Sequence, residues 1–176
     1  MSVDTDLNKQ VRNVAIAMGA IGTLWVATGG MCLFMMTAQK AILTFGGAQG
    51  DSKAPLELEP FKDSFENMLT MLHQIWSVWM PFLSLLGVFW VVCSVLLGFG
   101  GRRWRSLALV AVCCAVGWTL GYSYACIDFI EAFKEVFLLF PVGPPFFSEL
   151  ISTGAFFGFV FLLLKPLAVG FFVWRI

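Results

Sequence analysis

The sequence predicts an all-α integral membrane protein, a four-helix transmembrane bundle with a short interfacial amphipathic helix between the third and fourth helices. Of its 176 residues, 59% are hydrophobic and 12% are charged, whereas soluble domains are roughly 45–50% apolar and about 25% charged. Its long apolar stretches can each span the ~30 Å hydrocarbon core of a bilayer at 1.5 Å per helical residue. They cover approximately residues 14–37, 67–98, 106–127 and 150–174, with outer loops at about 38–66 and 128–149. We therefore expect a single transmembrane domain over residues 1–176.

The first predicted helix carries small residues on one face. Ala15, Gly19, Gly22, Val26 and Gly29 follow one another at alternating steps of four and three, which keeps them on the same side of a helix. Small side chains let a second helix backbone approach closely. This face is therefore predicted to pack against another helix, and Gly19 and Gly22 are candidate contacts with a partner.

The second predicted helix has a similar face and one proline. Pro81 removes a backbone hydrogen bond, so a bend is expected at this point. Ser84, Gly87 and Ser94 recur at heptad-like steps and form a second small-residue face. His73 precedes Ser84 by three turns and falls on the same face, so we expect its side chain to point toward protein rather than lipid.

His73 is the only histidine, and the sequence leaves two interpretations of it open. It is either a hydrogen-bonded residue at a helix interface or a ligand for haem, a chlorophyll-type pigment or another metal. Haem would need a second ligand from another subunit or from a methionine. We therefore predict no cofactor, with haem or pigment binding through His73 as the alternative. The cysteines all lie in apolar segments and are expected to be buried free thiols, with a Cys32–Cys126 disulfide as the alternative.

A basic turn separates the second and third helices. Arg102, Arg103 and Arg105 surround Trp104, and such a cluster is typical of a membrane boundary, where tryptophan acts as an interfacial anchor. The third helix follows the turn directly.

Residues 128–140 predict a different kind of helix. Phe129, Phe133 and Val136 fall on one stripe, opposite the acidic Asp128 and Glu131. This pattern indicates an amphipathic helix lying along the membrane interface or on a partner.

The fourth helix contains a cation within an apolar stretch. Lys165 is followed by Pro166 and shares a stripe with Gly154 and Gly158, whose spacing favours close helix contact. A lysine at such a depth costs about 2.5 kcal/mol or more, and every carboxylate of the chain lies in a loop or at a membrane edge. Three explanations remain: a partner on another chain or ligand, a neutral lysine, or a side chain that snorkels inward.

The distribution of charge predicts the orientation. Lys9, Arg12, the arginine turn and Arg175 fall on one side of the predicted membrane, and nine of the eleven acids fall on the other. By the positive-inside rule both termini are expected to be cytoplasmic, in a multi-pass protein of the cell membrane. The net charge of zero gives no basic surplus for nucleic acid and no Lys/Arg tract for anionic lipid.

These features favour a non-enzymatic subunit of a larger membrane complex. The helices have small-residue faces, Lys165 lacks a partner in its own chain, and no intramembrane carboxylate accompanies His73 to form a catalytic group. The expected partners are other membrane subunits in a hetero-complex, and lipids. One alternative is a small oligomeric channel or transporter with Lys165 and His73 near its pathway. A second is an electron-transfer subunit that binds its cofactor through His73.

Overall fold

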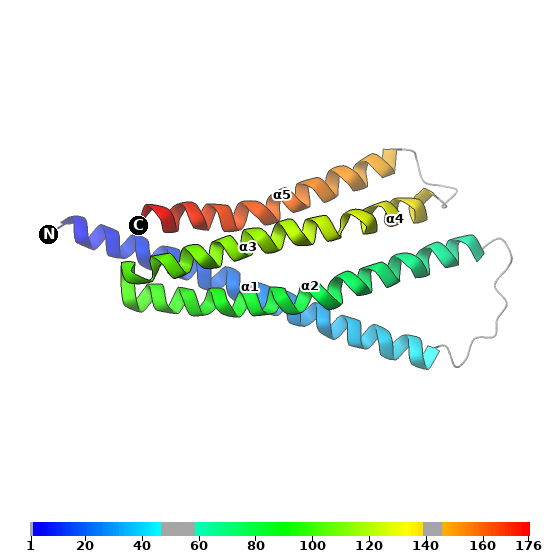
Figure 1. Cartoon of the computed structure of the whole chain (residues 1–176), viewed down its shortest axis with the longest axis horizontal. Coiled ribbons are helices and arrows are strands. Elements are labelled where there is room, and N and C mark those ends of the chain that lie inside the picture. Colours follow the sequence, from blue (N-terminus) through cyan, green and yellow to red (C-terminus); the bar gives the residue numbers. More distant parts are fainter. Residues whose placement is uncertain (1, 47–58, 139–145) are drawn as a thin grey trace.

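The computed structural model describes residues 2–46, 59–138 and 146–176, and within these ranges its regular elements are all helical (Figure 1). The elements are α1 (Ser2–Gly46), α2 (Glu59–Gly100), the short 3₁₀ helix η2 (Gly101–Trp104), α3 (Arg105–Ala125), α4 (Ile127–Leu138) and α5 (Phe146–Arg175). The helical segments include 4 that are long and apolar enough to cross a membrane. The prediction of an all-α fold with that many membrane-length helices is confirmed.

The helices are longer than hydropathy predicts. α1 continues to Gly46 and α2 begins at Glu59, so the prediction of an irregular loop over residues 38–66 is wrong at both of its ends. Hydropathy locates the apolar part of a helix, whereas polar residues such as Lys, Glu and Gln also support helical backbone. Apolar content therefore underestimates the length of both helices.

The four long helices form a ring in the order α1, α2, α3, α5. Each contacts its two neighbours, whereas the described backbones of the diagonal pairs, α1 with α3 and α2 with α5, do not approach each other. The start of α1, η2 and the end of α5 lie together at one end of the bundle, here called the terminal end (Figure 1). α4 and the start of α5 lie at the opposite end, here called the loop end.

The closest contact in the ring joins α1 to α2 through their small-residue faces. A β-carbon on Gly22 would lie 2.7 Å from the carbonyl oxygen of Gly87, and one on Gly87 would lie 2.6 Å from the carbonyl oxygen of Gly22. The two backbones therefore touch, with each Cα–H directed at the other helix's carbonyl, a weak but recurrent helix–helix interaction. Two turns away, the Ser94 hydroxyl donates to the carbonyl oxygen of Ala15 at 2.6 Å.

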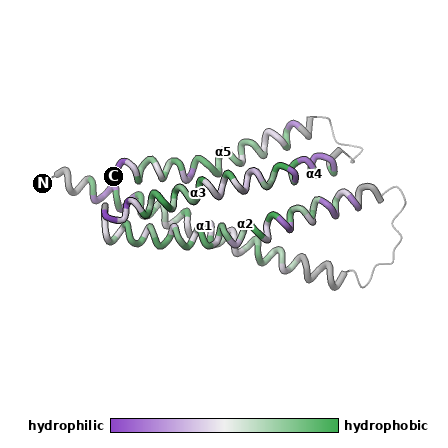
Figure 2. The backbone as a smooth tube through the Cα atoms, in the orientation of Figure 1, coloured by the Kyte–Doolittle hydropathy of each residue, from purple (hydrophilic) through white to green (hydrophobic). Residues whose placement is uncertain are grey.

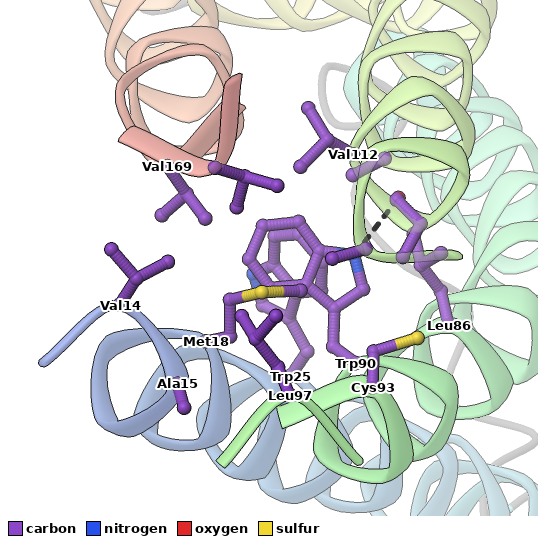
Figure 3. Close-up of a cluster of buried hydrophobic side chains, with 14 of the residues drawn as sticks. Val14, Ala15, Met18, Trp25, Leu86, Trp90, Cys93, Leu97, Val112 and Val169 are labelled. Atoms are coloured by element: carbon purple, nitrogen blue, oxygen red, sulfur yellow. Dashed lines mark hydrogen bonds between the residues drawn. The ribbon is translucent and has the colours of Figure 1, made fainter. Parts of the chain in front are cut away.

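A layer of large side chains fills the centre of the ring (Figure 3). Trp90 is fully buried, its ring centroid is 4.7 Å from that of Trp25, and its indole N–H donates to the carbonyl oxygen of Ala111 at 2.9 Å. Met18 is also fully buried beside them. The hydrogen bond satisfies a donor that would otherwise be costly to bury. Trp90 therefore links α1, α2 and α3.

Toward the loop end, α1 and α2 separate. Figure 1 shows α2 changing direction in its middle, the part of the helix that contains Pro81, as expected where a proline removes a backbone hydrogen bond. In this half α2 packs on α3 instead: the Trp118 indole donates to the carbonyl oxygen of Trp79 at 3.3 Å. A β-carbon on Gly121 would lie 2.5 Å from the Trp79 ring, so this contact also depends on a glycine.

The predicted amphipathic helix is present as α4, but its direction differs from the prediction. Backbone bonds from Cys126 to Tyr122 and from Ile130 to Cys126, each 3.0 Å, carry the chain from α3 into α4 with little change of direction (Figure 1). α4 contacts α2 and α5, and its Ala132 and Val136 are buried. Its apolar side is thus covered by the chain's own helices, because α2 extends far enough to receive it.

The contact between α1 and α2 predicts a position-specific effect of glycine replacement. Gly22→Ala should lower the free energy of unfolding by about 1–3 kcal/mol, because the added methyl group meets the backbone of α2. Gly30→Ala is the matched control, since nothing lies within 4 Å of the added atom, and it should be neutral or stabilising by up to about 1 kcal/mol. Denaturant unfolding in detergent measures both, and equal stability of the two variants would contradict the contact.

Candidate partner-binding face

α5 has one face against the bundle and one face that the described structure leaves uncovered. Pro166, Val169 and Val173 are buried, and a β-carbon on Gly170 would lie 2.8 Å from the Cγ1 atom of Val112 on α3. The uncovered face carries residues at helical spacing that are exposed or half-buried: Gly154, Gly158, Phe161, Lys165, Ala168 and Phe172. We call these six residues the outer face of α5.

Lys165 lies half-exposed on this face. Its Nζ atom is 4.8 Å from the centroid of the Phe161 ring, which is the one partner that the described residues give to the ammonium. Phe161 precedes Lys165 by about one turn, so the side chain is directed toward the loop end, as the tilt of Cα–Cβ bonds in a helix favours. In this conformation the side chain points away from the terminal end, toward which it would snorkel in one of the three explanations given above.

The ammonium is close to the middle of the apolar span. This span runs from Glu149 to Arg175, and Phe161 lies about 18 Å from its first residue and about 21 Å from its last at 1.5 Å per residue. Glu149 is the one acid of the described part of α5, and the other described acids near the bundle lie on the loop-end segments of α2 and on α4. No described carboxylate can reach Lys165 from these positions.

The glycines predicted as partner contacts fall into two classes. Gly19 and Gly22 are covered by α2 of the same chain, where Ser94 Oγ and Gly87 O lie 2.7 Å from their added β-carbons. As surfaces for another molecule these two residues are a wrong prediction, because α2 presents the complementary small residues. Gly154 and Gly158 are exposed and have nothing within 4 Å of an added β-carbon.

His73 and Lys165 are not brought together by the fold. His73 is half-buried near the loop end of α2, and the described backbones of α2 and α5 do not approach each other. Among the described residues no group of three or more His, Cys, Asp or Glu side chains could hold a metal ion. The cysteines are free thiols in the structure, including Cys32 and Cys126, so the alternative of a disulfide between these two is not what the structure contains.

The basic turn predicted as an interfacial anchor has a further role in holding helices together. Arg105 donates a hydrogen bond to the carbonyl oxygen of Trp174, which ties the start of α3 to the end of α5. Trp104 packs partly buried against the hydrophobic core, and Arg103 is exposed. The side chain of Arg102 lies outside the described residues. The turn therefore closes the terminal end of the bundle.

The contact between Lys165 and Phe161 is the part of the site that the sequence interpretation missed. A spacing of four residues on a helix was the available signal, because such residues are neighbours on the helix surface. Comparison with protein-family models, curated proteins and solved structures finds no match to this chain.

The two faces of α5 predict opposite responses to a bulky residue. Gly170→Leu should lower the free energy of unfolding of the isolated chain by about 1–3 kcal/mol, because the new side chain meets Val112. Gly158→Leu should leave it unchanged or raise it slightly, since the outer face is open. Thermal unfolding of both purified variants in the same detergent makes the comparison, and destabilisation by Gly158→Leu would mean that this face is covered within the chain.

Proposed function

We propose that this chain is a non-enzymatic integral membrane subunit of a hetero-oligomeric membrane complex, with both termini on the cytoplasmic side of the cell membrane. In this proposal the long helices span the bilayer, and the outer face of α5 binds a helix of another subunit. The observation that carries the proposal is Lys165, which lies at mid-span on an uncovered face with Phe161 as its described partner.

The energetic cost of placing Lys165 within the membrane supports a partner of opposite charge. A cation at the centre of a membrane helix costs about 2.5–3.5 kcal/mol on insertion scales, whereas a cation–π contact contributes roughly 0.5–2 kcal/mol. Phe161 therefore offsets only part of the cost. A carboxylate on a neighbouring transmembrane helix would offset the remainder, and Gly154 and Gly158 would let that helix approach closely.

The same residue argues against self-association through this face. Two copies inserted with the same orientation and packed about a two-fold axis would bring Lys165 against Lys165 at the same depth. Like charges in a medium of low dielectric constant repel strongly. The outer face of α5 therefore suits a different protein better than a second copy of this chain.

The alternative functions find less support in the arrangement of residues. A channel or transporter would need Lys165 and His73 near one pathway, but within one chain they lie on diagonal helices. An electron carrier would need a second ligand for a cofactor at His73, from a methionine or from another subunit. We therefore favour the subunit.

Replacing the lysine tests the proposal. Lys165→Met should insert and fold as the wild type does but should lower recovery of the native high-mass particle by about tenfold, because a paired charge is removed from a low-dielectric interface. Recovery is measured after mild detergent extraction from the native membrane, by native electrophoresis and by mass spectrometry of the co-purifying subunits.

Two further variants serve as controls for this experiment. Lys165→Arg keeps the cation and should retain most of the particle, and Leu164→Met changes a neighbouring exposed side chain without changing charge. A photoreactive residue introduced at Gly158 locates the partner helix. It should cross-link to a transmembrane helix that contains Asp or Glu. The proposal would be contradicted if the wild-type particle had the mass of the single chain. It would also be contradicted if Lys165→Met left the recovery of the high-mass particle unchanged.

The proposed orientation has its own test. A fluorescent protein fused after Ile176 should fold and fluoresce in the cytoplasm, whereas alkaline phosphatase fused at the same residue should be inactive there. Active phosphatase would place this terminus outside the cytoplasm and reverse the orientation.

A further inference from the structure

A recess opens at the terminal end of the bundle, between the start of α1 and the end of α2. It has a volume of about 450 Å³ and is lined on one side by Asn8, Lys9 and Arg12 and on the other by Gly98, Phe99 and Gly101. Gly101 has a φ of +63° and nothing within 4 Å of an added β-carbon, so the chain turns sharply here and leaves the wall open. The recess is separate from the outer face of α5.

The charged side chains that line the recess are both cations. Lys9 and Arg12 are exposed, and none of the described lining residues is acidic. Nearby, α3 begins without a side-chain cap and without an acid in its first turn, so the positive end of its dipole adds to the charge of Arg103 and Arg105. The fold thus gathers cations that are dispersed in the sequence, where no Lys/Arg tract is visible.

An apolar side chain stands directly beside these cations. Phe99 is 92% exposed, and an apolar side chain of this size is unfavourable in water relative to burial. At the boundary of a membrane it would instead contact the lipid. The recess therefore offers a polar, positive wall and an apolar one within a few residues of each other.

We propose that this recess binds the phosphate-bearing headgroup of an anionic phospholipid. Lys9 and Arg12 contact the phosphate, the Asn8 amide contacts headgroup hydroxyls or ester oxygens, and Phe99 packs against the upper acyl region. Basic pockets at the cytoplasmic ends of transmembrane helices are suited to such headgroups. A free phosphate ion would bind the cations but would make no favourable contact with Phe99, so a lipid fits the recess better. The inference rests on the proposed membrane orientation but not on a partner at α5.

Lipid binding to the purified full-length chain tests the inference. In native mass spectrometry, phosphatidylglycerol should bind more tightly than phosphatidylcholine, and its preference should weaken as salt is added, because exposed charges are screened. The double variant Lys9→Gln/Arg12→Gln should lower phosphatidylglycerol affinity by about 30-fold at low salt, from the usual contribution of each surface cation. It should change phosphatidylcholine binding much less, because the choline cation of that lipid offsets the attraction of its phosphate to Lys9 and Arg12.

Matched variants separate the recess from general attraction. Arg103→Gln/Arg175→Gln removes the same charge from the same end outside the recess and should change phosphatidylglycerol affinity by only about twofold to threefold. Phe99→Ala should weaken both lipids. Inorganic phosphate at millimolar concentration should not displace the lipid, and displacement would indicate a soluble anion site instead.

Two outcomes would overturn the inference. Equal loss in the two double variants, or equal binding of both lipids by the wild type, would reduce the recess to an unspecific part of a basic surface. Circular dichroism and gel filtration verify that each variant is folded. If Lys9→Gln/Arg12→Gln does not fold, the variant Lys9→Arg/Arg12→Lys replaces it, because it keeps both charges. This variant must still prefer phosphatidylglycerol, and loss of the preference would count against the site. The outcome of the fusion test at Ile176 does not depend on lipid binding. A wrong orientation can therefore be distinguished from a wrong assignment of the lipid site.

Discussion

The structure depends first on the contact of two helix backbones at Gly22 and Gly87. Because neither residue has a side chain, the carbonyl oxygen of each lies against the Cα atom of the other, and lipid cannot enter between α1 and α2. In a membrane, where apolar side chains gain little by leaving lipid for protein, such close packing and interhelical hydrogen bonds hold helices together. The contact fixes the spacing at which Trp25 and Trp90 fill the centre of the ring, and Trp90 in turn reaches the carbonyl oxygen of Ala111 on α3.

This arrangement uses the small-residue faces of α1 and α2 and the buried alanines of α3 inside the chain, and it leaves the small residues at the loop-end half of α5 outside it. Ala108, Ala111 and Ala115 are fully buried, whereas nothing in the described structure lies within 4 Å of a β-carbon added to Gly154 or Gly158. Glycines inside a helix lower its stability, and here no packing within the chain compensates for that loss. Its coincidence with a lysine on the same stripe is what distinguishes α5 from the other helices.

Sequence periodicity was sufficient to predict the helices and the small-residue faces, because both follow from the 3.6-residue repeat and from bilayer thickness. It was not sufficient to predict what each face contacts. Gly19 and Gly158 each stand three or four residues from another glycine in an apolar helix. An added β-carbon would nevertheless meet Ser94 of α2 at Gly19 and nothing within 4 Å at Gly158, because the contact depends on the ring order of the helices. The recess at Lys9 and Arg12 was missed for the same reason: its other wall comes from the end of α2, distant in the chain.

The division of roles along α5 bears on how strong and how selective its association would be. A buried ion pair contributes little net affinity relative to a well-packed apolar contact, because both charges must be desolvated. Contact area at Gly154 and Gly158 would therefore supply most of the strength. Lys165 would supply selectivity, since a helix without a carboxylate at its depth leaves the charge unpaired and a second copy of the chain brings a like charge. A single cation on an otherwise apolar face thus suits a surface that must recognise one neighbour among many apolar helices.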